Sequence, residues 1–473
     1  MKTQIRMFTI LAAACGFANA AAHAADIDRV IVRQQWPWST DIEIEYMLSG
    51  VTSPVNIHVQ AYNGSQELPA EQLADAISGD RYGVAHDGIG LLTIDPVKAF
   101  GTDSVVLPNF KVRLTLSDSA ANVNEVIYKI FDLATGDCTD VSRADILNGK
   151  YGAYETDYGK IGEGYNTTLE DVLIWTGVTN NIEYKTTKLV MRKIPANGVE
   201  TKIGGFEWQT LGKANAAVRT VSFTNDYYMS VFEFTEGQFL TLVTNTPNST
   251  ITYSRNKFTN GVERYIRPMN IPDYVSRARL SYWPTEESYG KGPFPDNRGT
   301  VIGNLRAQTG LVGFDLPTEA VWEYACRAGT TNDFYTGLNF TNNDDYKLIA
   351  RCNSNSGNPT PQNFDKPEIT DLLPSEGGSA IVGSYRPNAW GLYDMLGNLA
   401  EYCLDHYQAD VSAYGGPDPW GPVPSGGSSL YRVFRGSSYY LNYSYGNCSY
   451  RQNLSANSGS NPIIGLRLCL TVF

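Results

Sequence analysis

Cysteine and histidine are the side chains of this sequence with the widest range of chemistry, and their spacing restricts what they can do. Six of the seven cysteines and three of the four histidines lie beyond residue 25. They are Cys138, Cys326, Cys352, Cys403, Cys448 and Cys469, with His58, His86 and His406. Each histidine stands alone, with no Cys-x-x-Cys, His-x-x-x-His or Gly-x-Ser-x-Gly pattern nearby. A zinc hydrolase or a Ser-His-Asp triad is therefore poorly supported.

The first 25 residues are typical of a secretory signal peptide. A basic start at Lys2 and Arg6 precedes the apolar stretch Met7–Ala14, and Ala22-His23-Ala24 resembles the small-residue cleavage site of a signal peptide. The residues before Cys15 also loosely resemble a lipoprotein signal, which leaves lipid anchoring as an alternative. We expect export to the periplasm, the cell surface or the medium. The even number of remaining cysteines then favours disulfides, although six cysteines allow about 15 pairings.

The charge of the chain argues against capture of polyanions. There are 37 Lys and Arg against 49 Asp and Glu, a formal charge of −12. Removal of Lys2 and Arg6 with the signal peptide would leave 35 basic against 49 acidic residues, a charge of −14. We therefore expect neither nucleic acid nor an anionic membrane as a partner. No later apolar run reaches the ~18 residues of a transmembrane helix.

The elements that must position these side chains fall into three stretches. Residues 26–122 alternate apolar and polar positions in short runs, which predicts a small antiparallel β-sandwich. Its Trp36-Pro37-Trp38 segment could stack on carbohydrate or lie partly in the core. Residues 123–186 are expected to form a lead-in or linker, with a strand-like run at Val126–Ile130. Residues 187–473 have no low-complexity break and no internal repeat, which predicts one domain.

Two short helices are expected in this last domain. Thr235 is a suitable N-cap for a helix that reaches Val243, and Thr318 could cap Glu319–Arg327, whose apolar residues have helical spacing. Turns, glycines and aromatic strands make up the rest. The sequence thus predicts a loop-rich α+β fold.

Three ordered motifs of this domain resemble one protein family. They are Asp315–Gly329 (DLPTEAVWEYACRAG), Pro387–Tyr402 (PNAWGLYDMLGNLAEY) and Arg432–Ser438 (RVFRGSS), with a closing Gly465–Leu468. From about residue 187 to 473 the chain is similar to the sulfatase-modifying-factor family, whose best-known members are formylglycine-generating enzymes. The resemblance implies a loop-rich variant of the C-type lectin fold with two helices.

The resemblance also implies a chemistry. Enzymes of this family oxidise a cysteine in a Cys-x-Pro-x-Arg segment of a sulfatase to formylglycine, using O₂ and copper(I) held by two thiolates, and copper(I) favours such soft ligands. The thiolates lie five residues apart after an Arg-Gly-Gly-Ser segment. Counted from Arg435, the corresponding positions are Leu441 and Gly446. A two-residue insertion would bring Cys448 to the second position, but the first would still lack a thiol.

Cys448 is therefore the one candidate catalytic thiol, and it lacks the second ligand of a copper site. We expect it instead to form a disulfide with Cys403 or Cys469. The oxidase activity of the family is left open for this chain, and copper is a cofactor in the enzyme alternative alone.

A calcium site is a further expectation from the resemblance. The family binds a structural Ca²⁺ through side-chain oxygens at the positions of Asp394 and Glu401 and through carbonyls at Gly397 and Leu399. Hard oxygen ligands within eight residues suit calcium. The alternative is a solvated acidic turn.

Ser437 to Asn461 is the stretch most typical of a binding surface. Of its 25 residues, seven are Ser, five Tyr and five Asn, and Arg451 is the one charge. Tyrosine supplies rigid amphipathic area, while Ser and Asn supply adaptable hydrogen bonds. The stretch lies where the family places its active-site groove. We expect the groove to be lined by Tyr439, Tyr440, Asn442, Tyr443, Tyr445, Asn447 and Tyr450.

Several functions remain open at this point. The first is an exported, non-oxidase binding module for a protein, peptide or glycan. The second is an active formylglycine-generating enzyme acting on a sulfatase peptide. A third follows because Ser437–Asn461 also resembles the variable region of retroelement-diversified binding proteins that share this fold. A glycan-binding adhesion module is a weaker idea, and an ordinary polar C-terminus explains the composition equally well.

Overall fold

The computed structural model describes residues 25–34, 39–101, 109–120, 122–156, 172–205, 217–243, 262–270, 278–279, 300–337, 342–355, 378–422, 431–455 and 463–471. Several predicted features lie outside these residues: residues 1–24 of the signal peptide with Cys15, the Trp36-Pro37-Trp38 segment, and residues 456–461 of the Tyr/Ser/Asn-rich stretch. Contacts divide the chain into two compact units.

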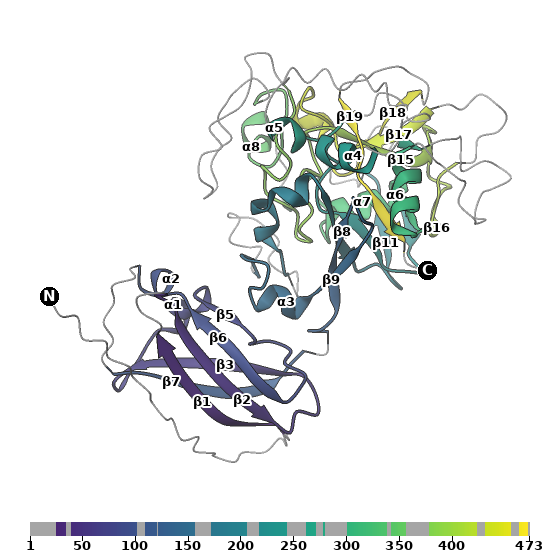
Figure 1. Ribbon diagram of the computed structural model, residues 1–473. Coiled ribbons are helices and arrows are strands. Elements are labelled where there is room, and N and C mark those ends of the chain that lie inside the picture. The colour runs from purple at the N-terminus through teal and green to yellow at the C-terminus, as the bar shows by residue number, and fades with distance from the viewer. Residues whose placement is uncertain are drawn as a thin grey trace. The chain divides into compact units, whose positions relative to one another are not determined.

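The described residues of the first unit form two antiparallel sheets and three short helices (Figure 1). One sheet has the order β1 (Asp26–Gln34), β2 (Ile42–Ser49), β6 (Gly88–Ile94) and β5 (Ile77–Gly79). The other has the order β4 (Gln66–Glu67), β3 (Val55–Asn63) and β7 (Phe110–Asp118). The helices are α1 (Ala70–Ala74), α2 (Pro96–Phe100) and α3 (Arg143–Leu147).

Strict alternation along the strands produces the core of this unit. Every second residue of β2 is buried, and the intervening ones are partly exposed. Because successive side chains of a strand point to opposite faces, one face of β2 is apolar. Its side chains share a hydrophobic cluster with those of β3, β6 and β7, so the two sheets enclose one core. Gly90 makes room for Tyr46 there, since a Cβ at Gly90 would lie 2.2 Å from the Tyr46 hydroxyl oxygen.

The stretch predicted as a lead-in or linker is largely folded, which corrects that interpretation for its first half. Val126–Asp132 is strand β8, and it pairs antiparallel with β10 (Lys188–Ile194) of the second unit. Most of its side chains are buried, because β8 lies between two other strands of its sheet. β9 (Cys138–Ser142) follows as the edge strand, and residues 141–154 then belong to the first unit again. Residues 157–171 lie outside the described part.

The second unit is a mixed α+β structure in which strands predominate (Figure 1). Its six-stranded sheet has the order β14 (Phe314–Asp315), β20 (Cys469–Thr471), β13 (Tyr227–Ser230), β10, β8 and β9. A four-stranded sheet has the order β18 (Gln452–Ser455), β17 (Tyr431–Arg435), β15 (Ala400–His406) and β19 (Ile464–Gly465). The third sheet has the order β11 (Glu200–Ile203), β12 (Arg219–Ser222) and β16 (Gly416–Pro417).

Both predicted helices are present, as α4 (Glu236–Val243) and α7 (Glu319–Arg327). Thr318 caps α7 as predicted, since its hydroxyl oxygen accepts a hydrogen bond from the Val321 amide at 3.3 Å. The prediction missed α6 (Val301–Thr309), which starts at the N-cap Thr300 and ends at a left-handed Gly310. It also missed short turns, namely α5 (Val262–Tyr265), α8 (Asn343–Tyr346), η2 (Thr176–Asn180), η3 (Ile182–Lys185) and η5 (Tyr443–Tyr445). None of the helices in the described ranges has the length and apolar character that a bilayer crossing requires.

Candidate functional site

The Tyr/Ser/Asn-rich stretch is a long loop that joins two paired strands. β17 and β18 pair antiparallel from Phe434↔Gln452 to Tyr431↔Ser455. The connecting residues 436–451, which we call the Tyr loop, begin with two left-handed residues, Gly436 (φ 88°) and Ser437 (φ 69°). The carbonyl of Met395 and the Trp322 ring lie close to Gly436, where a Cβ would come within 3.0 Å of that carbonyl oxygen. Glycine at this position therefore permits both the turn and its tight packing.

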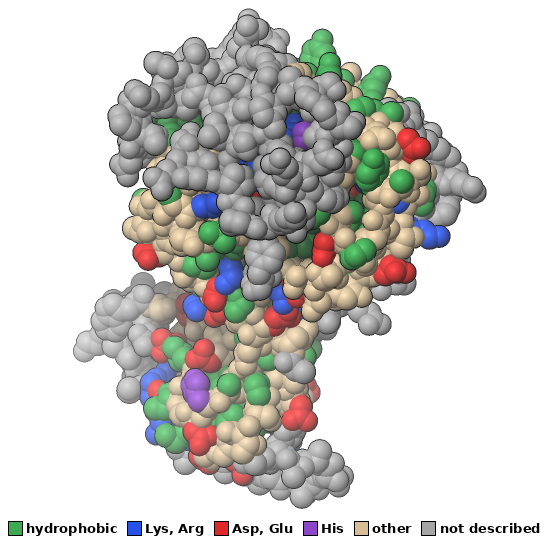
Figure 2. Space-filling view, turned by 90° about the vertical axis from the view of Figure 1, so that its right-hand side faces the viewer, with side chains coloured by type: hydrophobic (Ala, Val, Ile, Leu, Met, Phe, Trp, Pro, Cys, Tyr) green, Lys and Arg blue, Asp and Glu red, His purple; other side chains and the backbone are tan. Residues whose placement is uncertain are grey.

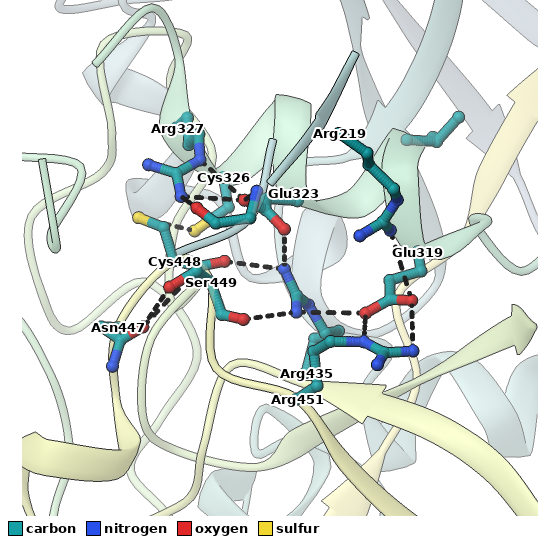
Figure 3. A network of polar contacts seen from close by, with 12 residues as sticks. Arg219, Glu319, Glu323, Cys326, Arg327, Arg435, Asn447, Cys448, Ser449 and Arg451 are labelled. Carbon is teal, nitrogen blue, oxygen red and sulfur yellow. Dashed lines mark hydrogen bonds and ion pairs between the residues drawn. The ribbon is translucent and has the colours of Figure 1, made fainter. Parts of the chain in front are cut away.

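Buried arginines hold the C-terminal end of the Tyr loop, which leads into β18, against α7 (Figure 3). Arg435 donates hydrogen bonds to the carbonyls of Ser449 at 2.9 Å and Cys448 at 2.8 Å. Its guanidinium also pairs with Glu319, at 3.2 Å, and with Glu323. Arg451 pairs with both oxygens of the Glu319 carboxylate. All four charged side chains are almost completely buried, so two glutamates of one helix fix the course of the loop.

The electrostatics of this cluster keep its glutamates ionised. Burial alone would raise the pKa of Glu319, but Arg451, Arg435 and Arg219 outweigh it and lower that pKa to about 2. Burial likewise opposes ionisation of Glu323, and neighbouring arginines still lower its pKa. Asp405 behaves in the opposite way, because burial and the Glu319 charge raise its pKa to about 8. Glu319 and Glu323 are therefore ionised and paired with arginines, whereas Asp405 holds its proton more readily than an ordinary aspartate.

The seven predicted groove residues divide by exposure. Tyr440 is 70% exposed and Tyr445 37% exposed. The other three tyrosines are partly buried, and they are Tyr439, Tyr443 and Tyr450. The rings of Tyr445 and Tyr450 meet edge to face, with centroids 5.3 Å apart. The tyrosines of the loop thus offer aromatic area at the surface.

The two predicted asparagines serve the loop itself. The side-chain oxygen of Asn447, which is fully buried, accepts hydrogen bonds from the amide and hydroxyl of Ser449 at 3.1 and 2.9 Å. That of Asn442 accepts from the Ser444 amide at 3.1 Å and caps the short helix η5. These contacts hold the turns of the loop.

A cavity lies in a different segment. It has a volume of about 370 Å³ and is lined by Ala413, Tyr414, Gly415, Pro417, Asp418, Pro419 and Trp420. None of the seven predicted groove residues lines it. The sequence analysis gave no signal for it, because its residues form an irregular connection between β15 and β17.

The two loop positions that would supply copper ligands do not fit a copper ion. Leu441 carries an aliphatic side chain, and its carbonyl accepts a hydrogen bond from the Asn353 amide at 3.0 Å. Gly446 is buried against Tyr346 of α8. A Cβ at Gly446 would lie 1.9 Å from the Tyr346 hydroxyl oxygen, so a cysteine could not enter without displacing that ring. Neither position offers the soft sulfur donor that copper(I) favours.

Cys448 does have a neighbouring thiol, but not the one expected. Its Sγ lies 3.5 Å from Sγ of Cys326 in α7, and both residues are fully buried. In the part of the chain that the structure describes, no sulfur contact joins it to Cys403 or Cys469, the expected disulfide partners. Sequence spacing could not reveal this pair, because 122 residues separate its members.

Asp394 and Glu401, two of the predicted calcium ligands, belong to a buried acidic cluster. One Asp394 oxygen accepts from the Gly383 amide at 2.6 Å, and the other is buried without a hydrogen-bond partner. Glu401 accepts from Arg467 and from the Trp322 indole. Burial raises the pKa of both carboxyls, that of Asp394 to about 6. The free Asp394 oxygen fits a cation ligand, whereas both Glu401 oxygens already have partners.

Glu233 also belongs to this cluster, and no motif of the sequence pointed to it. Its carboxylate accepts from the amide of Leu399 at 2.8 Å and from the side chain of Asn398 at 2.5 Å. Burial and the neighbouring Asp394 and Glu401 raise its pKa well above the usual value. The three carboxyl groups lie near one guanidinium, that of Arg467, which pairs with Glu401 at 2.8 Å. Within the described ranges, however, no group of three or more His, Cys, Asp or Glu side chains is arranged to hold a metal.

The match to a known family lies in this second unit. Residues 191–472 match the family model described as "Sulfatase-modifying factor enzyme 1-like domain". Formylglycine-generating enzyme of Streptomyces coelicolor is 35% identical over 152 residues, which cover 32% of this chain and 43% of that enzyme. The enzyme of Thermomonospora curvata is 32% identical over 190 residues, which cover 38% and 57%. The chain thus spans about half the length of these relatives.

Solved structures with a similar chain course include two bacterial proteins. Treponema denticola variable protein 1 has a TM-score of 0.40 at 22% identity, covering 60% of this chain and 96% of that one. PvdO from Pseudomonas aeruginosa has a TM-score of 0.43 at 17% identity, covering 60% and 94%. Because the family model spans more than half of the sequence, the chain belongs to the family of proteins with a sulfatase-modifying factor enzyme 1-like domain.

Proposed function

We propose that this protein is an exported binding module on a formylglycine-generating-enzyme-type scaffold and that it lacks copper-dependent oxidase activity. One observation carries the proposal: Gly446 is packed against the Tyr346 hydroxyl, so that a cysteine at its position would require the Tyr346 ring to move. Leu441 provides no ligand atom at the other position. Without two thiolates there, the loop cannot hold copper(I) as the family's oxidases do.

The Tyr loop is the binding surface in this proposal. Its exposed and partly buried tyrosines supply aromatic area, and its one charge, Arg451, is buried against Glu319. An uncharged aromatic surface suits a neutral stretch of protein, peptide or glycan. Figure 2 shows Lys and Arg scattered among acidic and uncharged side chains on the described part of one face.

Further parts of the proposal concern the setting of this surface. We place a calcium ion at Asp394, Glu401 and the carbonyls of Gly397 and Leu399, supported by the unpartnered Asp394 oxygen. It would fix the turn beside β15. We regard the second unit as a C-type-lectin-like variant and residues 26–122 as a β-sandwich, supported by two sheets that share one core.

The experiment is a screen of the mature protein against a glycan array and a random peptide library. We compare it with a Tyr440→Ala/Tyr445→Ala variant. Tyr265→Ala is the matched control, because Tyr265 is 41% exposed but lies in α5, outside the loop. Ligands bound by the wild type and the control but lost in the loop variant support the proposal. Ligands retained equally by all three proteins contradict it.

One observation favours the enzyme alternative, an active formylglycine-generating enzyme that acts on a sulfatase peptide. The thiols of Cys326 and Cys448 are close enough to act together. Both are fully buried, however, whereas a peptide cysteine must reach the reacting sulfur. The alternative therefore requires the C-terminal end of the Tyr loop to move away from α7, so that a peptide can reach the thiols.

A further inference from the structure

The cavity beside β16 has walls that the fold holds in place. Residues 413–415 and 417–420 line it, and β16 between them pairs in parallel with β12. Gly415 lies so close to β12 that a Cβ there would come within 2.4 Å of the Thr220 carbonyl oxygen. Pro417 and Pro419 restrict the backbone further, because their rings fix φ. A site formed in advance loses less entropy when a ligand enters it.

Asp418 is the one charged residue among those that line the cavity. Its carboxylate accepts hydrogen bonds from the Thr224 amide at 3.1 Å and from the Thr224 hydroxyl, and its own amide donates to the Ser222 carbonyl at 2.8 Å. These partners are neutral, and none of the ion pairs between described residues includes Asp418. The side chain is exposed, so a ligand can reach it. Within the described residues, the cavity thus has a fixed negative charge without a counter-charge.

Two aromatic residues line the same cavity. Tyr414 and Trp420 are both partly exposed there. Because the face of an aromatic ring attracts cations, a carboxylate together with such rings suits a cationic group and disfavours an anionic one. The volume of about 370 Å³ is close to the lower limit of ligand pockets, about 300 Å³, so the cavity fits a small group.

Gln408 links the cavity to the Tyr loop. The Tyr414 hydroxyl donates to the side-chain oxygen of Gln408 at 3.0 Å, and Arg451 donates to the Gln408 carbonyl at 2.9 Å. The Arg451 guanidinium also lies over the Tyr407 ring, 5.3 Å from its centroid. A chain of direct contacts thus joins the cavity to the end of the Tyr loop, and one extended ligand can contact both.

We infer that this cavity binds the ammonium group of a lysine side chain, presented by a peptide whose uncharged residues lie on the Tyr loop. Lysine suits the small cavity because its ammonium is compact and its stem is flexible, whereas a guanidinium is a larger planar group. Charge complementarity with Asp418 favours this ligand over a neutral glycan. The inference rests on the proposed function and names its ligand class.

The test uses the mature chain and a library of peptides with one lysine among uncharged residues. Each peptide is paired with a copy in which the lysine Nζ is acetylated and therefore uncharged. The wild type is compared with Asp418→Asn, which keeps an acceptor for Thr224 but removes the charge. Asp410→Asn is the matched control, because Asp410 is exposed on the same connection but lies outside the cavity.

We expect acetylation to weaken binding to the wild type by about tenfold or more, as the loss of an ion pair and a cation–π contact implies. Asp418→Asn should lose binding of the unmodified peptides by a similar factor, and the control should bind them as the wild type does. Higher salt should weaken the wild-type complex, because part of the attraction is between charges.

Equal affinity of the wild type for free and acetylated peptides overturns the inference, and this comparison does not depend on the folding of any variant. A lysine preference that Asp418→Asn retains also overturns it, as does binding of no lysine peptide or of neutral glycans alone. Failure of the proposed function looks different, since Tyr440→Ala/Tyr445→Ala would then bind every ligand as the wild type does. Ligands that depend on these tyrosines but not on Asp418 overturn the lysine site alone.

Discussion

At the scale of single residues, the packing of Gly446 against Tyr346 can be tested. We predict that Gly446→Ala destabilises the second unit by about 1–3 kcal/mol, because the new methyl group overpacks against Tyr346. The buried Tyr346 hydroxyl has no hydrogen-bond partner, so Tyr346→Phe should be neutral or stabilising. Denaturant unfolding measures both. A Gly446→Ala variant as stable as the wild type would show that the ring yields easily.

Asp394 and Glu401 give a second test at this scale. If calcium binds there, it stabilises the native state by mass action, and chelation should lower the melting temperature. We predict the same loss for Glu401→Ala in calcium-containing buffer, with no further effect of the chelator on that variant. Calorimetry with and without chelator decides the matter. Identical melting of the wild type in both buffers would argue for a solvated acidic turn in place of the site.

Glu319 predicts how stability depends on pH. Its pKa falls from the usual 4.5 to about 2 in the folded chain, because three arginines outweigh its burial. A carboxyl with a lowered folded pKa contributes stability above its unfolded pKa and loses it as the pH falls through the folded value. We therefore expect the free energy of unfolding to decline between pH 4.5 and 2. That decline should be smaller in Glu319→Gln than in the exposed control Glu200→Gln, and equal declines would contradict the assignment.

At the scale of elements, the Tyr loop depends on α7 through buried ion pairs. We predict that Arg451→Met destabilises the second unit by about 3–5 kcal/mol, because it leaves Glu319 buried with one partner fewer. Arg33→Met removes an exposed pair with Glu45 and should cost less than about 1 kcal/mol. Calorimetry of the two variants gives the comparison. Similarly small losses of stability in both variants would mean that the buried ion pairs between the Tyr loop and α7 contribute little to stability.

Individual elements also differ in how far they could be predicted from the sequence. The helix at Glu319–Arg327 was predictable because a capping threonine precedes apolar residues at helical spacing. Composition drew attention to the Tyr loop, but it could not separate the exposed Tyr440 from the buried Asn447, since both are polar loop residues. The Cys326–Cys448 contact depends on tertiary packing between segments 122 residues apart, which no local pattern encodes.

At the scale of the whole molecule, the chain does not run through its two units in simple order. Residues 127–140 leave the first unit to add β8 and β9 to the sheet of the second, and residues 141–154 return to the first. The sequence analysis predicted a linker there because the mixed pattern of 123–186 has no single period. Strand pairing over a long sequence separation, as between β8 and β10, is decided by the sheet that a strand joins.

The most direct test of the account is whether the protein oxidises a peptide cysteine. The mature protein is incubated with copper(I), O₂ and a Cys-x-Pro-x-Arg peptide, beside a Cys448→Ser variant, and the peptide is examined by mass spectrometry. We predict no formylglycine with either protein, and no copper retained by the folded wild type. Turnover by the wild type that is lost in Cys448→Ser would contradict the account and place an oxidase site at the buried thiol pair.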